Sequence, residues 1–189
     1  MYPVFIPGVS FYSALRRIDE DLCRHTRDRR CPACGGPLHR ADFERKPRGG
    51  PVDLPADLNR RLDLCCGRCR RRELPPSCLF LGRKVYWAAI VLLAVLMREQ
   101  RTEGYTARKL REMFGVCRGT VLRWVAFFRE VLPTSRWWRG VRGRLGPGVR
   151  DGDLPGSLLA DFRRAAWSDE EALKACLCFL ADARAGPAG

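Results

Sequence analysis

The sequence predicts a mainly α protein with a small β ribbon, in which the ribbon precedes a three-helix domain and a short helical tail. Three observations predict this fold class: two C-x-x-C pairs bracket a Pro- and Gly-rich stretch, apolar residues recur at helical spacing, and a glycine separates two amphipathic segments. Five segments are therefore expected: an N-terminal helix in 1–30, the ribbon in 31–76, the three-helix domain in 77–133, a basic linker in 134–156 and C-terminal helices in 157–189.

The first predicted helix covers residues 11 to 29. Phe11, Leu15, Ile18 and Leu22 recur at helical spacing, and charged residues lie between them. Such a stripe is typical of a helix that packs against a core.

The cysteines of the ribbon have the spacing of a metal site. The stretch CPACGG supplies Cys31 and Cys34, and LCCGRC supplies Cys66 and Cys69 at the same spacing. Zn²⁺ takes four soft ligands in a tetrahedron, so two such turns predict a zinc ribbon held by these four thiolates. Cys65 is an alternative to Cys66, and the alternative to a metal site is a set of free buried thiols.

Short strands are expected around Leu38–Phe43 and Arg61–Cys66, and the Pro and Gly content of Lys46–Pro55 predicts a loop. Ligand partners at good spacing are lacking for Cys23, Cys78, Cys176 and Cys178. Of these, Cys176 and Cys178 lie in a predicted apolar helix, and burial in the core is their favoured interpretation. His39 lies near the first pair and is a less favoured substitute ligand.

Three helices are expected between residues 84 and 132. Thirteen apolar residues, Val85–Met97, rise about 20 Å as a helix, which is short of the roughly 30 Å hydrocarbon layer, so they predict a buried helix. The other two helices are expected at Thr106–Phe114 and Arg118–Val131, with Pro133 ending the last.

The stretch TARKLREMFGVCRGTVLRWV has the pattern of a helix-turn-helix, with Gly115 as the turn residue. Leu110, Phe114, Val116, Val121, Trp124, Val125 and Phe128 are expected to face inward. Arg118, Thr120 and Arg123 are then expected on the outer N-terminal face of the second helix, the part that enters the major groove in this motif. Phosphate contacts are expected from Arg108, Lys109 and Arg111 on the preceding helix, and from Arg71 beside the second cysteine pair. The alternative is a helical hairpin with solvated arginines.

In the tail, short helices are expected near Ser157–Ala166 and Asp169–Ala183. Ser168 followed three residues later by Glu171 fits a capping box for the second of them.

Composition favours a polyanionic partner. The net charge is +14 in 189 residues, and double-stranded DNA is the first candidate. A GC-rich genome also enriches arginine, so the excess of arginine alone does not demonstrate binding. The start of the chain carries no basic segment of a secretory signal, which predicts a cytoplasmic, nucleoid-associated bacterial protein without a membrane partner. In a reducing compartment, ten cysteines point to metal binding or burial rather than disulfides.

The order of ribbon and helix-turn-helix resembles the N-terminal DNA-binding part of bacterial insertion-sequence transposases, and small zinc-ribbon/helix-turn-helix proteins of mobile elements. The motifs CPACGG, CCGRCRRRELPPS and TARKLREMFGVCRGTVLRW carry this resemblance over residues 31 to 131. It implies recognition of element-end or promoter DNA. Such transposases continue into an RNase-H-like catalytic domain, whereas here Asp151, Asp153 and Asp161 are crowded together beside Gly and Pro, so the chain is predicted to bind DNA without being an enzyme.

Other functions remain open from the sequence alone. The chain fits an accessory or truncated transposase subunit that acts with a transposase or recombinase partner, a transcriptional regulator, or an interaction protein. Trp137, Trp138 and Trp167 would form the docking surface of an interaction protein, although burial in the core is the favoured interpretation of these three residues. RNA is an alternative partner, since zinc ribbons and arginine-rich segments also bind RNA. No small-molecule substrate is predicted.

Overall fold

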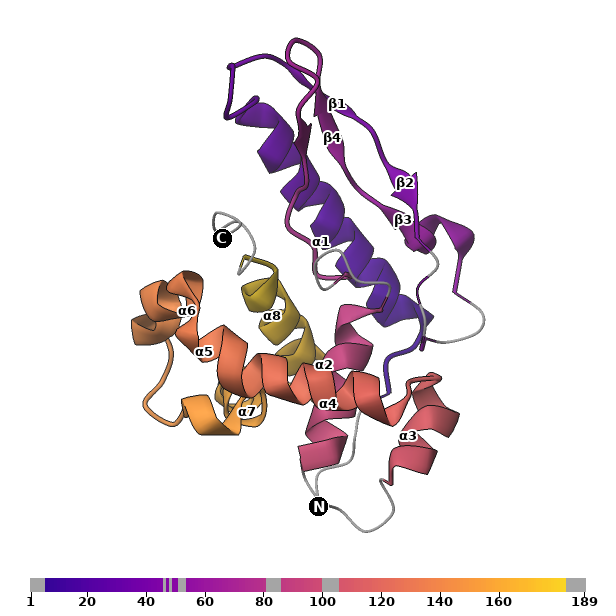
Figure 1. Cartoon of the computed structure of the whole chain (residues 1–189), viewed down its shortest axis with the longest axis vertical. Helices are drawn as coiled ribbons and strands as arrows, with labels where there is room; N and C mark the ends of the chain where they lie inside the picture. The colour runs from indigo at the N-terminus through magenta and orange to yellow at the C-terminus, as the bar shows by residue number, and fades with distance from the viewer. Residues whose placement is uncertain are drawn as a thin grey trace.

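In the computed structural model the described residues are 6–45, 47, 49–50, 54–80, 86–99 and 106–182. They form a mainly helical chain with small antiparallel sheets and a cysteine cluster. Figure 1 shows two parts, a ribbon with helix α1 (Val9–Asp28) along it and a body of helices. No helix within the described ranges is both long enough and apolar enough to cross a membrane. Half of the expected loop Lys46–Pro55, most of the stretch between the first two expected helices of the three-helix domain, and the ends of two expected helices at Val85 and Ala183 lie outside the described residues.

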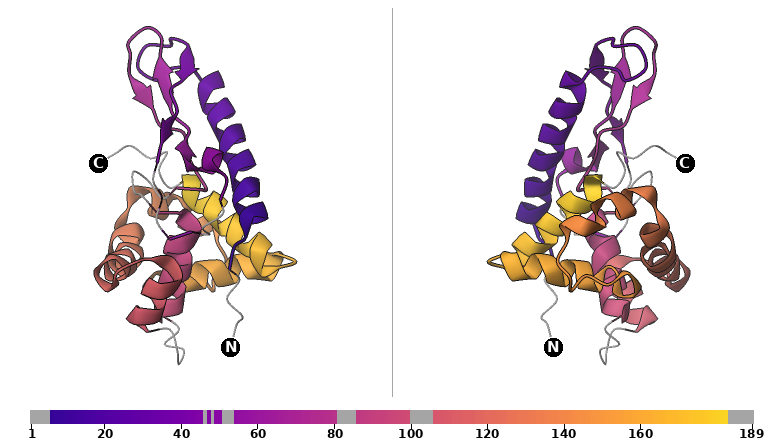
Figure 2. Two further views of the ribbon diagram at one scale, coloured as in Figure 1. Left: turned by 90° about the vertical axis from the view of Figure 1, so that its right-hand side faces the viewer. Right: turned by 90° about the vertical axis from the view of Figure 1, so that its left-hand side faces the viewer.

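Helix α1 joins the two parts because its buried residues belong to two different cores. Phe11, Tyr12 and Leu15 near its start pack in the core of the helical body. Cys23, two turns further on, packs in a separate small core inside the ribbon. The predicted helix over residues 11–29 is confirmed to within two residues, and Figure 2 shows it running along the ribbon into the body.

Five short strands build the ribbon. β1 (Leu38–Arg40) pairs antiparallel with β4 (Leu64–Cys66), with Leu38 opposite Cys66, and β4 pairs antiparallel with β5 (Arg72–Glu73). β2 (Phe43–Glu44) pairs antiparallel with β3 (Arg60–Arg61), which follows the 3₁₀ turn η1 (Ala56–Asn59). Strands β1 to β4 thus lie at or within one residue of the two predicted stretches, whereas β5 was not predicted. The ribbon core contains Cys23, Cys31, Leu38, Leu62, Leu64 and Cys66, with Cys34 packed against it.

The helical body is built around α2 (Ala88–Glu99). Every residue from Trp87 to Met97 is buried, as expected of a helix that is apolar on all sides and surrounded by protein. Two helices of the predicted helix-turn-helix pack against it, α3 (Ala107–Phe114) and α4 (Arg118–Ala126).

The helix expected at Arg118–Val131 is helical throughout but continues through Pro133 to Thr134, so the prediction that Pro133 ends it is wrong. The chain continues through a π-helical segment, η2 (Phe127–Val131), into α5 (Leu132–Thr134). Leu132 donates its backbone N–H to the carbonyl of Phe127, five residues back, which is the bond of a π-turn. Pro133 then lies in the first turn of α5, where its missing N–H is not needed.

Residues 134–156 are not the linker that their composition predicts. They form α6 (Arg136–Val141) and the 3₁₀ turns η3 (Arg142–Arg144) and η4 (Asp151–Asp153). Trp138, Val149 and Leu154 are buried in the core of the helical body. Ser135 caps α6 by accepting the N–H of Trp138 at 3.1 Å. Single apolar residues spaced along a Gly- and Arg-rich stretch are therefore enough to fix it against the body.

The tail forms α7 (Gly156–Ala165) and α8 (Asp169–Asp182), within one residue of the predicted ranges where described. The Ser168 hydroxyl accepts the N–H of Glu171 at 3.2 Å, so the predicted cap is confirmed. The Glu171 carboxylate accepts the N–H of Trp167 rather than that of Ser168. The Trp167 side chain itself is 97% exposed, whereas Trp138 is buried.

Candidate metal centre

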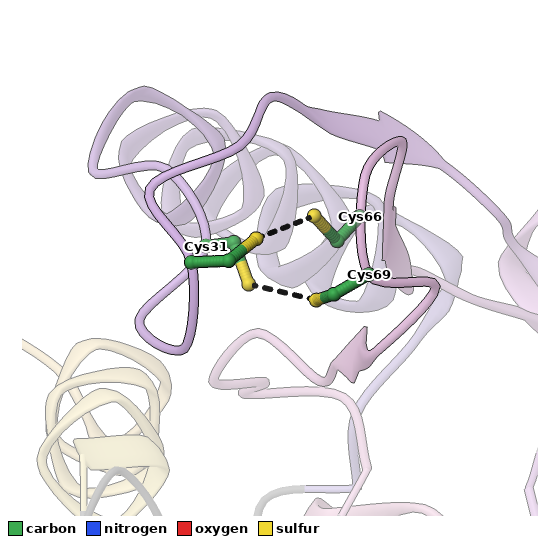
Figure 3. A group of neighbouring side chains, drawn as sticks. Cys31, Cys66 and Cys69 are labelled. Carbon is green, nitrogen blue, oxygen red and sulfur yellow. Dashed lines mark hydrogen bonds between the residues drawn. The ribbon is translucent and has the colours of Figure 1, made fainter.

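Four cysteine sulfurs meet at the end of the ribbon. The Sγ atoms of Cys31, Cys34, Cys66 and Cys69 lie within 4.8 Å of one another, and they form the cluster that could hold a metal ion. Figure 3 shows sulfurs of the first pair facing Cys66 and Cys69 across the gap between two loops. The sulfurs of Cys31 and Cys69 are 3.7 Å apart, and those of Cys34 and Cys66 are 3.5 Å apart. A tetrahedron with metal–sulfur bonds of about 2.3 Å has edges of about 3.8 Å, so the spacing fits a four-thiolate site.

The first loop is a tight turn held by its own backbone. The N–H of Gly35 donates to the carbonyl of Cys31 at 2.9 Å, and the N–H of Cys31 donates to the carbonyl of Gly36 at 3.0 Å. Gly35 has a φ of +66°, which glycine adopts without steric cost. A Cβ at Gly36 would lie 3.0 Å from the sulfur of Cys66, so the two loops approach closely only because this residue has no side chain.

The second loop repeats this backbone pattern. The N–H of Arg70 donates to the carbonyl of Cys66 at 3.1 Å, and the N–H of Cys66 donates to the carbonyl of Arg71 at 2.9 Å. Arg70 takes the left-handed position of Gly35, with a φ of +61°. Gly67 donates to the carbonyl of Pro37 at 2.9 Å, which ties the second loop to the end of the first. Two equivalent turns thus present four sulfurs to one point.

Cys66, not Cys65, belongs to the cluster. Adjacent residues of a strand point to opposite faces, and Cys66 faces the ribbon core with Leu64. The sulfur of Cys65 lies 3.6 Å from the carbonyl oxygen of Arg70, outside the cluster. His39, which lies opposite Cys65 in the ladder, is exposed and is not part of the cluster either.

The thiols of the cluster differ in acidity. The backbone N–H groups of Cys69 and Arg68 point at the sulfur of Cys66, which outweighs partial burial and lowers the pKa of Cys66 to about 6. The N–H of Arg71 acts in the same direction on Cys69, but the sulfur of Cys34, burial and the other cluster sulfurs together raise the pKa of Cys69 to about 12. Cys66 therefore loses its proton first, and its negative charge opposes the ionisation of a second thiol beside it. A bound divalent cation would favour the thiolate form of all four cysteines.

The ribbon core, against which the cluster lies, is small. Three of the six buried residues in that core are cysteines, and two of these three belong to the cluster. So small an apolar core contributes little to stability by itself. Because four protein thiolates would fill a tetrahedral site, no position would be left for water or substrate, which is the arrangement of a structural metal.

The residues around Gly115 lie largely as the sequence predicted. Gly115 has a φ of +61° and donates its N–H to the carbonyl of Arg111 at 2.8 Å, which closes α3. Thr106 caps α3 by accepting the N–H of Lys109 at 3.3 Å. The predicted inner-face residues Leu110, Phe114, Val116, Val121, Trp124 and Phe128 are buried, and Val125 is partly buried.

Thr120 does not lie on the outer face, contrary to the prediction. It is buried, and its hydroxyl accepts a hydrogen bond from the Arg123 guanidinium at 3.1 Å and contacts the Cys117 sulfur at 3.2 Å. Thr120 is four residues before Trp124, so helical spacing places both on the inward side. Arg118 and Arg123 are exposed, the first at the start of α4 and the second in its last turn.

The predicted phosphate-contacting residues are all exposed but fall in two places. Arg108, Lys109 and Arg111 lie on α3, where Arg108 forms an ion pair with Glu112 at 3.5 Å. Arg71 lies in the second loop of the cysteine cluster. Figure 1 places that loop and α3 at opposite ends of the long axis of the molecule, so these residues do not form one surface.

Comparisons with known protein families, with curated proteins and with solved structures found no match to this chain. Its function is therefore inferred from the residues and their arrangement.

The sequence did not reveal a polar contact between α1 and the segment that leaves the ribbon. Asp19 is buried and accepts hydrogen bonds from the hydroxyl of Ser77 and the N–H of Cys78. The position of Asp19 on the otherwise apolar face of α1 was the available signal for a buried polar contact. Its partners could not be identified from the sequence because they lie nearly sixty residues away.

Proposed function

We propose that this chain is a sequence-specific double-stranded DNA-binding protein of mobile-element type, with one structural zinc and α3–α4 as a helix-turn-helix reader. The observation that carries the proposal is a pair of exposed arginines on α4, Arg118 in its first turn and Arg123 in its last, which follow a left-handed turn at Gly115. The net charge of +14 favours the same class of partner.

Zinc is the proposed metal because the cluster offers only thiolates. Soft sulfur ligands in a tetrahedron select Zn²⁺ or iron–sulfur chemistry over Mg²⁺ or Ca²⁺, and paired C-x-x-C turns are typical of zinc ribbons. The sulfur–sulfur distances of 3.5 and 3.7 Å support a single ion.

Helix α4 is proposed to enter the major groove. Arg118 and Arg123 would bond guanine O6 and N7, the most common base contact of arginine. Gly119 between them has open space around its Cα, so the backbone can approach the bases closely. Thr120 is buried and is therefore no longer proposed to contact bases. Its hydroxyl instead orients the guanidinium of Arg123.

The carboxylates near the end of the chain also fit a binding protein better than an enzyme. Asp151, Asp153 and Asp161 each form an ion pair with a different arginine. They are not gathered as the shared ligands of a pair of metal ions, which strand-transfer chemistry requires.

Selection of bound sequences from a random duplex pool tests the proposal. We expect enrichment of a defined site, and fluorescence anisotropy should then show that Arg123→Ala costs about 1–3 kcal/mol on that site and relaxes its preference. Arg108→Ala should weaken all duplexes alike and reduce the salt dependence by about one counterion.

Arg17→Ala, which removes an exposed arginine of α1, is the matched control and should change neither property. Failure to bind duplex DNA at low salt, or unchanged preference in the Arg123 variant, would overturn this assignment.

A further inference from the structure

A hollow on the ribbon lies apart from both the cysteine cluster and α3–α4. Its volume is about 400 Å³, within the range of small-ligand sites, and it is lined by Phe43, Arg45, Asp63, Arg72 and Leu74. Strand β2 supplies the phenyl ring and β5 supplies one of the two arginines. In Figure 1, β2 lies between the end of the ribbon and the helical body.

The hollow combines flat and cationic groups. The guanidinium carbon of Arg45 is 4.8 Å from the centre of the Phe43 ring, and that of Arg72 is 5.8 Å from it. These cation–π contacts hold two guanidinium groups beside one aromatic ring. Aromatic rings and guanidinium planes are the surfaces on which unpaired nucleobases stack in proteins.

Its charge and exposure favour an anionic ligand with an apolar part. Arg72 pairs with the buried carboxylate of Asp63 and donates to the carbonyl of Ala41 at 2.9 Å, yet its side chain remains 59% exposed. Two arginines and one aspartate line the hollow, so the formal charge of these five residues is positive. Leu74 is 40% exposed, which is unusual for a large apolar side chain and gives the hollow an apolar edge.

We propose that this hollow binds an unpaired nucleotide of a single-stranded nucleic acid. The base would stack among Phe43, the guanidinium planes and Leu74, and the adjoining phosphates would contact Arg45 and Arg72. An acidic peptide would satisfy the arginines but supplies no flat ring for the apolar part of the hollow. The site goes beyond the proposed duplex reading, because none of its residues belongs to α3 or α4.

Fluorescence anisotropy with labelled (dT)₁₂ and (U)₁₂ measures the site directly. Phe43→Leu should weaken binding at least about tenfold, since much of the affinity for a single strand comes from bases that stack on aromatic side chains. Arg45→Gln should weaken it and lower its salt dependence. The matched controls are Trp167→Leu, which removes an exposed aromatic ring elsewhere, and Arg17→Gln, which removes an exposed arginine of α1.

The controls should bind both strands as the unsubstituted protein does. Equal losses in Phe43→Leu and Trp167→Leu would show general stacking and overturn the proposal, as would absence of binding to both oligonucleotides. A preference between the two strands identifies DNA or RNA as the ligand. Duplex binding without single-strand binding would refute this site alone, and the reverse result would refute the helix-turn-helix reader alone.

A cross-link in the unsubstituted protein avoids any effect of substitution on folding. Photolysis of (dT)₁₂ that contains 5-iododeoxyuridine should attach it to the peptide that contains Phe43, which mass spectrometry identifies. Cross-links only to peptides of the helical body would contradict the proposal. Circular dichroism of Phe43→Leu should match that of the unsubstituted protein and so separate lost binding from lost structure.

Discussion

Asp19 is the buried carboxylate that joins α1 to the segment leaving the ribbon. It accepts the hydroxyl of Ser77 at 2.5 Å and the N–H of Cys78 at 2.6 Å, and the charge of Arg61 also favours its ionised form. Burial outweighs these contacts and raises the pKa of Asp19 to about 6. At neutral pH the folded protein therefore holds a charge that the unfolded chain exposes to water more favourably.

This raised pKa predicts that the Asp19 contribution to stability falls as the pH rises. The folded pKa of about 6 lies above the ordinary value of 3.8, so the contribution is complete below about pH 4 and is lost through pH 6. The change amounts to about 3 kcal/mol. Urea unfolding of the protein and of Asp19→Asn, from pH 4 to 7.5, should show their difference in unfolding free energy moving by this amount. A difference that is constant with pH would refute the prediction.

At the level of single residues, local spacing predicted the sulfur cluster but not the contacts made across the fold. The choice of Cys66 over Cys65 follows from strand alternation once Leu64 is placed in the core. Thr120 was misplaced, although its four-residue spacing to Trp124 already indicated the inner face. Nothing local could identify Ser77 as the partner of Asp19, because folding alone brings them together.

Among the elements, the turn between α3 and α4 depends on one backbone conformation. Gly115 has a φ of +61°, and a Cβ there would meet nothing within 4 Å, so only the backbone conformation disfavours a side chain. Gly115→Ala should therefore lower the free energy of unfolding by about 1–2 kcal/mol, measured by urea denaturation.

Gly119→Ala is the matched control for this turn. Gly119 also has open space around it, but it lies inside α4 at an ordinary φ. Alanine there should raise stability by about 0.5–1 kcal/mol, since it restricts the unfolded chain and favours helix. Changes of the same sign in both variants would show that the turn does not require a left-handed residue.

Elements with strong apolar periodicity were predicted to within a few residues. Elements whose structure depends on contacts with other parts of the fold were not. The ends of α3 follow from the cap at Thr106 and the left-handed residue Gly115. The prediction that Pro133 ends the helix was wrong because the π-turn before this residue removes the need for its N–H. No sequence pattern indicates such a turn. In residues 134–156, the composition predicted a linker and did not indicate that Trp138 and Leu154 are buried, because their burial is decided by the neighbouring helices.

Across the whole molecule, the cysteine cluster and the proposed reader are distant from each other. Figures 1 and 2 place the cluster at one end of the long axis and α3 toward the other. A bound metal would therefore order the ribbon, and its influence on α3–α4 would pass through α1 and the main core rather than through direct contact.

The two separate cores predict that metal removal unfolds one part only. Chelation, or Cys34→Ser, should remove about one zinc per chain and unfold the ribbon, because its six-residue core is too small to replace a metal contribution of about 10–16 kcal/mol. Hydrogen exchange should then show lost protection in β1 and β4 and retained protection in α2, whose residues belong to the other core. Cys65→Ser, one residue from a ligand, should keep both metal and protection. Loss of protection in α2 together with β4 would mean that the two cores unfold as one unit.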